Sequence, residues 1–341
     1  MKKVAFFDTK KYDREWFEKL DKSFEIKFFK EKLNPENADL AANFDGAIAF
    51  VNDDINSSTL KILADNGVSV LAMRCSGYNN INFKAARDYN IKVLRVPVYS
   101  PYAVAEHTIA MLLTLNRKIH KAYIRTRDFN FSLNGLTGFD LNGKTIGVIG
   151  TGKIGQIFIK ICQGFGMKVL AYDPYPVKDP DFEYAELDRI YRESDAISLH
   201  CPLTNESHHL LNKEAFDKMK KNVFIINTSR GGLIDSEALL EALKSKKIAG
   251  AGLDVYEEET ELFFEDHSEK IVNDDILARL VSLPNVIVTS HQAFLTEEAL
   301  KNIAEITIGN LEDYFAGRPL KNVVCYDCED GKPTTDCDKC S

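Results

Sequence analysis

Short runs of apolar, β-branched or aromatic residues alternate with helical patterns along almost the whole chain. In the first hundred residues, the runs that predict strands lie at 4–8, 24–30, 45–50, 68–75 and 91–97. Helical patterns cover 58–67 and 83–90 between them. Strands that alternate with crossover helices are typical of parallel sheets, so this region is expected to have an α/β fold.

A long apolar helix is predicted from Tyr102 to Ile119, with Pro101 suited to its first turn. Its apolar residues exceed one stripe, which predicts burial against a second domain or a second subunit. Six more strand candidates follow, at 145–150, 168–173, 196–201, 223–229, 248–255 and 285–291. The acidic segment 257–285 is expected to be an irregular insertion, and a last helix is expected from Thr296 to about Phe315. The pattern therefore predicts two α/β units.

Composition agrees with this division and narrows the possible partners. The 341 residues, 45% hydrophobic and 28% charged, are enough for two domains with separate cores. A net charge of -8 argues against general attraction to nucleic acid or anionic membranes. Only four apolar residues lie between the two N-terminal lysines and Asp8, and no stretch approaches the roughly 18 to 20 apolar residues of a membrane span. A cytosolic protein is expected.

A glycine-rich sequence follows the first strand of the second series. Gly150, Gly152 and Gly155 form G-x-G-x-x-G between a predicted strand and a predicted helix. The motif alone could be a turn in another α/β protein, but this context favours a dinucleotide site with the pyrophosphate at the helix N-terminus. The helix itself is expected to bury five apolar residues, which are Ile154, Ile157, Phe158, Ile161 and Phe165.

Asp173 ends the next predicted strand, 18 residues beyond Gly155. A carboxylate there can accept hydrogen bonds from the ribose hydroxyls of the adenosine and would repel a 2′-phosphate. No arginine follows it in PYPVK to reverse that preference. The sequence therefore predicts NAD as the cofactor in preference to NADP.

Three further residues fall at or just beyond the predicted strand ends of the second unit. They are Arg230, Glu259 and His291. Taken singly, they could be a surface ion pair, part of a solvated acidic run and a hydrogen-bonded core histidine. Together they offer a carboxylate anchor, a proton donor and a carboxylate that orients it, which the reduction of a carbonyl by hydride requires.

At this point the chain resembles the D-isomer-specific 2-hydroxyacid dehydrogenases, and within that family the NAD-dependent fermentative D-lactate branch. The resemblance covers about residues 1 to 324. It rests on the strings CSGYNN, RVPVYSPYAVAEH, GKTIGVIGTGKIG, SLHCPLT, NTSRGGLID, LDVYEEE, LFFEDHS and SHQAFLTEEAL. It implies that Arg230 binds the substrate's carboxylate and carbonyl, that His291 is the acid/base, and that Glu259 hydrogen-bonds His291. The implied reaction is the NADH-dependent reduction of pyruvate to D-lactate.

The resemblance also implies residues that bind the substrate and the cofactor. Backbone N–H groups around Ser76 and Gly77 would bind the substrate carboxylate, while Tyr99 and Phe294 would line the substrate site. Lys153 departs from family members that carry histidine there. The implied NAD-binding residues are Gly150, Gly152, Lys153, Ile154, Gly155, Asp173, Cys201, Pro202, Thr228, Ser229 and Asp254.

The family fold implies that the chain returns to its first domain near its end. Residues 1–100 and 296–324 would form a flavodoxin-like substrate domain, and 101–295 a Rossmann NAD-binding domain, both doubly wound parallel-sheet folds. Hinges near Pro101 and Leu295 would let the cleft between the domains close on the substrate. A homodimer or homotetramer is expected.

Two alternative functions and one unexplained segment remain. A related dehydrogenase for bulkier 2-oxo acids differs by only a few pocket residues. An NAD-regulated corepressor would use the same fold, although the acidic composition gives it no support. The tail 325–341 carries Cys325, Cys328, Cys337 and Cys340 in two C-x-x-C pairs, which could hold a structural zinc ion or could belong to a disordered or disulfide-prone tail. No catalytic metal is expected.

Overall fold

A computed structural model of the chain describes residues 1–258 and 262–324. The chain divides into two compact units, one that joins Met1–Ser100 to the described residues from Leu295 onward, and one that spans Pro101–Phe294. Glu259 and the four cysteines of the tail lie outside the described residues. No helix in the described part combines the length and apolar character needed to cross a membrane.

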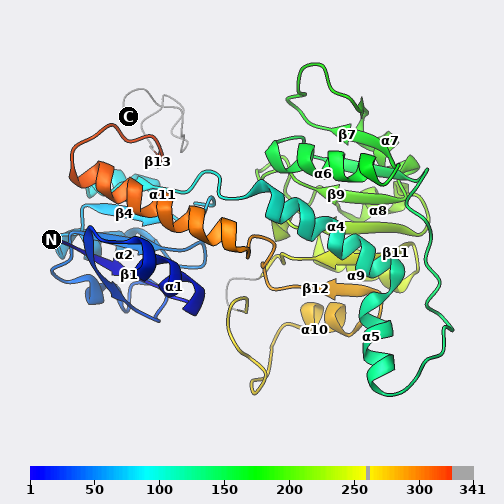
Figure 1. Cartoon of the computed structure of the whole chain (residues 1–341), viewed down its shortest axis with the longest axis horizontal. Helices are drawn as coiled ribbons and strands as arrows, with labels where there is room; N and C mark the ends of the chain where they lie inside the picture. Colours follow the sequence, from blue (N-terminus) through cyan, green and yellow to red (C-terminus); the bar gives the residue numbers. More distant parts are fainter. Residues whose placement is uncertain (259–261, 325–341) are drawn as a thin grey trace. The chain divides into compact units, whose positions relative to one another are not determined.

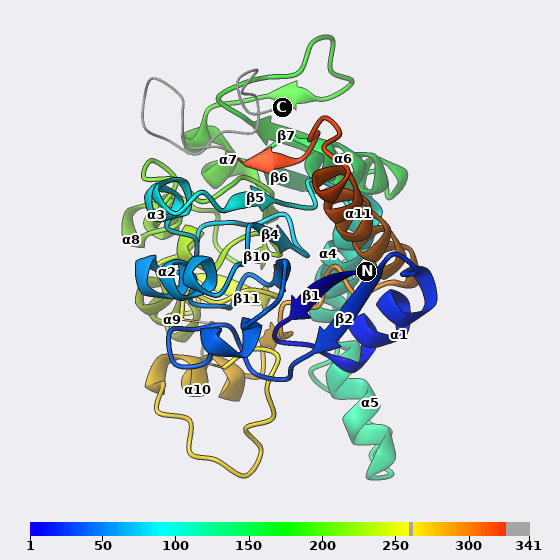
Figure 2. The same cartoon turned by 90° about the vertical axis from the view of Figure 1, so that its left-hand side faces the viewer.

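The first unit is built on a six-stranded sheet in the order β13-β5-β4-β3-β1-β2. Its strands are β1 (Lys2–Phe6), β2 (Phe24–Phe28), β3 (Gly46–Ala49), β4 (Val70–Met73), β5 (Lys92–Leu94) and β13 (Val323–Val324). The first five pair in parallel in the flavodoxin-like order 2-1-3-4-5. β13 is an antiparallel edge strand beside β5, the red arrow in Figure 2, and the sequence pattern did not predict it.

Helices from both ends of the chain cover one face of this sheet (Figure 1). The helices of the unit are α1 (Lys11–Leu20), α2 (Ser57–Asp65), α3 (Phe83–Asp88) and α11 (Glu297–Phe315), with a 3-10 turn, η1 (Ala38–Ala41). Phe17 of α1 and Ile308 of α11 pack in one core with Phe6 and Val70 of the strands. The Thr296 side chain caps α11 by accepting a hydrogen bond from the Ala299 N–H. The last helix therefore belongs to the first sheet.

The second unit is built on a seven-stranded, wholly parallel sheet in the order β12-β11-β10-β9-β6-β7-β8. Its strands are β6 (Thr145–Ile149), β7 (Lys168–Tyr172), β8 (Glu183–Tyr184), β9 (Ala196–Leu199), β10 (Val223–Asn227), β11 (Ile248–Leu253) and β12 (Val286–Val288). This is the Rossmann order 3-2-1-4-5-6 with one more strand. The six predicted strands are present, β8 is additional, and the strand order reverses between β6 and β9.

Helices cover both faces of the second sheet (Figure 1). They are α4 (Pro101–Arg117), α5 (Ile119–Arg127), α6 (Lys153–Gly164), α7 (Leu187–Glu193), α8 (Lys213–Lys218), α9 (Ser236–Lys244) and α10 (Asp275–Ser282), with a 3-10 turn, η2 (Gly231–Leu233). One core lies under α4 and α6, and the other lies under α7, α8, α9 and α10. The two-unit α/β architecture predicted from the pattern is confirmed.

Apolar residues of α4, such as Leu112, pack on the sheet of their own unit. The expected burial of this helix against a second domain or a second subunit stays a prediction. Other local predictions are wrong. Lys118 has a left-handed backbone (φ 51°) and separates α4 from α5. Phe165 is exposed at the end of α6, where Ile159 and Cys162 are buried instead. Outside the undescribed residues 259–261, the acidic insertion contains one regular helix, α10.

Candidate active site

The glycine-rich turn after β6 combines tight packing with one open position. Gly150 has a φ of +100°, and a Cβ there would lie 2.5 Å from the carbonyl carbon of His200. A Cβ on Gly155 would lie 2.1 Å from the Gly150 oxygen, whereas a Cβ on Gly152 would have no heavy atom within 4 Å. The turn thus packs α6 closely against β6 and leaves free space at its middle glycine, as pyrophosphate binding at a helix N-terminus requires.

Asp173, directly after β7, is held beside this turn. Its Oδ2 accepts hydrogen bonds from the Thr151 N–H (2.7 Å) and from the Thr151 hydroxyl (3.0 Å), and its Oδ1 accepts one from the Tyr175 N–H (2.9 Å). The Tyr184 hydroxyl lies 2.8 Å from the Thr151 hydroxyl. Sequence reasoning missed Thr151 and Tyr184, although Thr151 lies between the first two glycines. The carboxylate is therefore fixed before any ribose arrives.

The ends of β9 and β10 lie side by side, next to the switch point between β6 and β9 where the strand order reverses. The Ser229 hydroxyl donates to the Cys201 carbonyl oxygen (2.6 Å), and the Thr228 hydroxyl lies 2.8 Å from the hydroxyl of buried Thr108 in α4. Burial raises the pKa of Cys201 to about 11. Its thiol is therefore protonated near neutral pH and is no redox nucleophile there.

Buried Asn227 shapes the turn that carries Arg230. Its Oδ1 accepts a hydrogen bond from the Ser229 N–H (3.0 Å), and its Nδ2 donates to the Arg230 carbonyl oxygen (2.8 Å). The Arg230 guanidinium in turn donates to the Ser229 carbonyl oxygen (2.7 Å). A Cβ on Gly231 would lie 2.0 Å from the Tyr256 carbonyl, so this turn packs directly on the segment that follows β11.

Asp254 at the end of β11 organises the segment that follows β12. It is fully buried, and its carboxylate accepts hydrogen bonds from the Thr289 hydroxyl (2.5 Å) and from the N–H groups of Gln292 (2.9 Å) and Ala293 (2.8 Å). His107 Nε2 lies 3.4 Å from the same carboxylate. The family resemblance assigned Asp254 to NAD, which stays a prediction; in the structure its carboxylate accepts hydrogen bonds from the 289–293 segment. Sequence reasoning missed Thr289 and His107 because they are distant from Asp254 along the chain and contact it only in the folded structure.

His291 sits in the middle of this segment in a strained conformation. Its N–H donates to the Asp254 carbonyl oxygen (2.7 Å), and its φ is 52°, in the left-handed region. Such strain in a residue other than glycine is concentrated at functional sites. The half-buried imidazole packs against the ring of Phe264, with the ring centroids 5.8 Å apart. Phe294, three residues later, is buried.

In the first unit, Arg95 holds the loop that follows β4. Its guanidinium donates to the Ser76 carbonyl oxygen (2.9 Å) and lies 5.2 Å from the centre of the Tyr78 ring. The Cys75 thiol donates to the Gly77 carbonyl oxygen (3.2 Å). Sequence reasoning missed Arg95. The fixed backbone leaves the predicted anion-binding loop with a defined shape.

Tyr99 and the far side of the same loop are also tied down. Tyr99, beyond β5, accepts a hydrogen bond at its carbonyl oxygen from the Asn302 side chain of α11 (2.6 Å). The Asn80 side chain donates to the carbonyl oxygens of Phe50 (3.0 Å) and Asp53 (2.8 Å). Both predicted substrate-binding segments of the first unit are therefore anchored to its sheet and to α11.

The structure brings most of the predicted residues of the second unit to one edge of its sheet. Each of them follows the carboxyl end of a parallel strand, where open α/β sheets bind ligands. These residues, in chain order, are Gly150, Gly152, Lys153, Ile154, Gly155, Asp173, Cys201, Pro202, Thr228, Ser229, Arg230, Asp254 and His291. The arrangement can bind a dinucleotide at the switch point and present a cation and an imidazole beside it.

Comparison with known proteins agrees with this geometry. Residues 109–293 match the model of the D-isomer specific 2-hydroxyacid dehydrogenase NAD-binding domain. The chain is 50% identical to a D-lactate dehydrogenase of Escherichia coli and 51% identical to a 2-hydroxyacid dehydrogenase homolog of Haemophilus influenzae, in each case over 94% of this chain and 99% of the relative. A solved structure described as the pyruvate reductase of Chlamydomonas reinhardtii matches with a TM-score of 0.90 and 43% identity, over 94% of this chain and 98% of that one.

The relatives and the solved structure match nearly the whole chain, and together with the family model they confirm the family resemblance that its motifs indicated. The cofactor implied by Gly150 to Gly155 and Asp173 is likewise the one that the matched domain binds. The chain therefore belongs to the D-isomer-specific 2-hydroxyacid dehydrogenases and is an NAD-dependent oxidoreductase.

Proposed function

We propose that the enzyme reduces pyruvate to D-lactate with NADH and catalyses the reverse oxidation. The observation that carries this proposal is the placement of Arg230 and His291 beyond the same sheet edge as the glycine-rich turn, each on a segment fixed by a buried residue. The names of the E. coli and Chlamydomonas relatives support the choice of pyruvate.

The proposed chemistry assigns one task to each side chain. NADH, when bound, supplies the hydride that adds to C2 of the substrate. Protonated His291 donates its proton to the carbonyl oxygen as that hydride adds, and takes it back in the oxidation direction. The planar guanidinium of Arg230 binds the substrate carboxylate and polarises the carbonyl. Glu259, which lies outside the described residues, is assigned the role of orienting His291.

Substrate selection is assigned to four residues. We infer that the backbone N–H groups around Ser76 and Gly77 bind the carboxylate, in a loop that Arg95 holds in shape. Tyr99 and Phe294 limit the space for the substrate side chain. One methylene changes binding by only about 1 to 3 kcal/mol in such a pocket, so a preference for pyruvate must be measured.

The test is a panel of 2-oxo acids with NADH, in which kcat/KM and product chirality are both determined. Pyruvate, 2-oxoisocaproate and phenylpyruvate sample increasing side-chain size. The proposal predicts that pyruvate has the highest kcat/KM and gives D-lactate. A higher value for a bulky acid would instead identify a D-2-hydroxyacid dehydrogenase for larger substrates, and negligible turnover of every acid would point to an NAD-regulated binding protein.

We also propose that the enzyme forms a homo-oligomer. Helix α5 projects from the end of α4 (Figure 1) and has no buried residue in the single chain. It and the segment after it expose several large apolar side chains, which are Ile119, Tyr123, Ile124, Phe129, Phe131 and Leu133. Exposed apolar patches of this kind are typical of protein interfaces. Light scattering of the wild type and of Ile124→Asp tests the proposal, because only a dimer or tetramer that shifts toward monomer in the variant agrees with it.

A further inference from the structure

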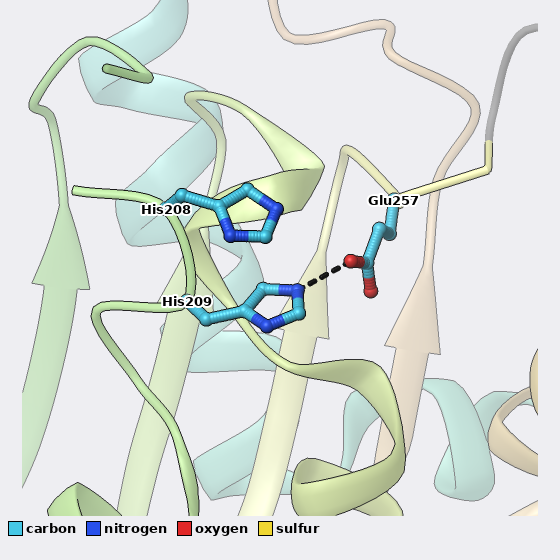
Figure 3. Close-up of side chains that lie close together, drawn as sticks. All are labelled: His208, His209 and Glu257. Atoms are coloured by element: carbon cyan, nitrogen blue, oxygen red, sulfur yellow. Dashed lines mark hydrogen bonds and ion pairs between the residues drawn. The ribbon is translucent and has the colours of Figure 1, made fainter. Parts of the chain in front are cut away.

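A compact group of metal-ligand side chains lies in the second unit, and none of its members is among the residues assigned above. Figure 3 shows His208 and His209, from the loop after β9, facing Glu257 from the segment after β11. His209 Nε2 lies 2.5 Å from Glu257 Oε1, and the two imidazole rings stack with their centroids 3.9 Å apart. One ligand atom from each of the three residues lies within 4.8 Å of the other two.

The backbone around these side chains is fixed by contacts of its own. The His209 N–H donates to the Gly232 carbonyl oxygen (2.8 Å), and the His208 N–H donates to Thr204 (2.9 Å). His209 has a φ of 51°, so a residue other than glycine is held in the left-handed region. Gly231 packs directly on the backbone of Tyr256 and Glu257. The turn at Gly231 and Gly232 therefore contacts both segments that supply the ligands.

We propose that His208, His209 and Glu257 bind a divalent transition-metal ion of the Zn²⁺ class, with water as the fourth ligand. Two imidazoles and one carboxylate are a donor set that suits Zn²⁺, whereas Mg²⁺ and Ca²⁺ prefer oxygen ligands alone. The His209 and Glu257 side chains are 34% and 25% exposed, so an ion can reach them from solvent. The proposed ligand set includes none of the four cysteines of the tail, and the hydride transfer proposed above assigns no role to these three residues.

The distances allow this coordination after small side-chain rotations. Tetrahedral ligands about 2.0 to 2.2 Å from Zn²⁺ lie roughly 3.3 to 3.6 Å from one another. That separation falls between the 2.5 Å of the hydrogen-bonded pair and the 4.8 Å limit of the whole group. The ion would replace the hydrogen bond between His209 and Glu257, and the His208 ring would turn out of the stack to direct a nitrogen at it.

The competing explanation is a hydrogen-bonded pair, His209 with Glu257, against which His208 merely stacks. His208 distinguishes the two explanations because the pair does not require its nitrogen atoms. His208→Phe keeps an aromatic ring for stacking and removes only the ligand. Since His208 is exposed, this replacement should leave the fold intact. Glu257→Gln removes the charged ligand, and Glu258→Gln, at the exposed neighbouring position, is its matched control.

The experiment is a titration of untagged, full-length, chelator-treated protein in which Cys325, Cys328, Cys337 and Cys340 are replaced by serine. Zn²⁺ binding is followed by calorimetry, and Co²⁺ binding by its visible absorption. We expect one equivalent per chain, with protons released because the imidazoles must bind unprotonated. His208→Phe and Glu257→Gln should each weaken binding by at least the roughly 10- to 100-fold that loss of an outer-shell partner costs. Glu258→Gln should bind as the parent does.

Thermal unfolding provides a second readout that does not depend on activity. An ion that binds only the folded chain raises the unfolding midpoint, so Zn²⁺ should stabilise the parent and Glu258→Gln but not Glu257→Gln. Mg²⁺ should leave the midpoint unchanged. The proposal is overturned if the parent shows no saturable Zn²⁺ binding, or if His208→Phe and Glu257→Gln bind as tightly as the parent. Either outcome would leave the dehydrogenase proposal untouched.

Discussion

The backbone N–H of His291 donates a hydrogen bond to the carbonyl oxygen of Asp254 over 2.7 Å, and the Asp254 carboxylate accepts bonds from the two residues that follow the histidine. One buried aspartate therefore shapes both sides of the turn on which His291 has a left-handed backbone. We therefore predict that Asp254 positions the proposed acid/base, and its assignment to the cofactor stays a separate prediction.

Asp254→Asn should lower kcat/KM mainly by misplacing His291. The amide keeps the size of the carboxylate but loses its charge and one acceptor atom, and a displacement of about 1 Å can cost on the order of 100-fold in rate. NADH affinity, measured by its fluorescence, should change much less. Thr289→Val removes one donor to the same carboxylate and should cause a smaller loss, whereas Thr289→Ser keeps the hydroxyl and should resemble the wild type. A defect confined to NADH affinity would instead support the direct cofactor role.

Arg230→Lys should lose most of kcat/KM although the charge is kept. An ammonium group cannot reproduce the planar, two-donor contact with a carboxylate and carbonyl, and loss of one such donor to a developing oxyanion costs roughly 10²- to 10³-fold. NADH binding should persist, and His291→Gln should behave similarly. The matched control is Arg279→Lys at an exposed position of α10. A nearly active Arg230→Lys enzyme is incompatible with the bidentate role.

The sequence was sufficient to predict the strands and helices that have a long apolar pattern. It was insufficient to predict the short strands that tertiary contacts define. The strands around Ile146 and Ile225 are buried on both faces and read as continuous apolar runs. β13 has two residues and exists only because Val323 and Val324 pair with β5, while β8 depends in the same way on β7. No local pattern contains that information.

The same limit applies to the site. Gly150, Gly152, Gly155 and Asp173 have a fixed spacing within one βαβ unit, so the sequence contains their relationship. Contacts such as those of Thr289 with Asp254 and of Asn227 with the Arg230 turn form only when the strands are folded together, so the sequence alone does not reveal them. The group of His208, His209 and Glu257 is of this second kind, because 48 residues separate His209 from Glu257 along the chain.

Gly155→Ala should destabilise the second unit and abolish NADH binding. The added Cβ would lie 2.1 Å from the Gly150 carbonyl oxygen, so either α6 or the turn before it must shift. Because the proposed phosphate site is made by α6 and this turn together, either shift should disrupt it. Gly164→Ala in the same helix is the matched control, because its Cβ would have no heavy atom within 4 Å. Alanine there should be neutral or stabilise the protein by up to about 1 kcal/mol. Urea unfolding and NADH titration of both variants check the contrast.

Asp173→Ala should weaken NADH binding and narrow the preference for NADH over NADPH. The variant loses the acceptor for the ribose hydroxyls together with the charge that would repel a 2′-phosphate. Tyr184→Phe keeps the carboxylate and removes only the hydroxyl beside Thr151, so it should have a smaller effect. Competition between NADH and NADPH, expressed as the ratio of their kcat/KM values, measures the change. An unchanged ratio in Asp173→Ala would show that another group selects the cofactor.

Asp53→Asn should change the pH dependence of stability in the first unit. Burial, only partly opposed by the hydrogen bond from the Phe50 N–H, raises the pKa of Asp53 from 3.8 to about 7. Between these values the folded chain holds a proton that the unfolded chain has released. The contribution of this group to the free energy of unfolding therefore falls as pH rises from about 4 to about 7, by at most about 1.4 kcal/mol per pH unit.

The variant lacks this titration, so the difference in unfolding free energy, wild type minus Asp53→Asn, should decrease steadily with pH across that window and level off above about pH 7. Urea unfolding at half-unit steps from pH 4.5 to 8, a range set by that window, measures the difference. Asp54→Asn, at the exposed neighbouring position, is the control for replacing an aspartate by asparagine in this loop. If the Asp53→Asn difference is flat, or if it grows with pH, then Asp53 is ionised in the folded protein throughout this range. Its two backbone partners, Leu33 and Phe50, would in that case stabilise the charge more strongly than burial opposes it.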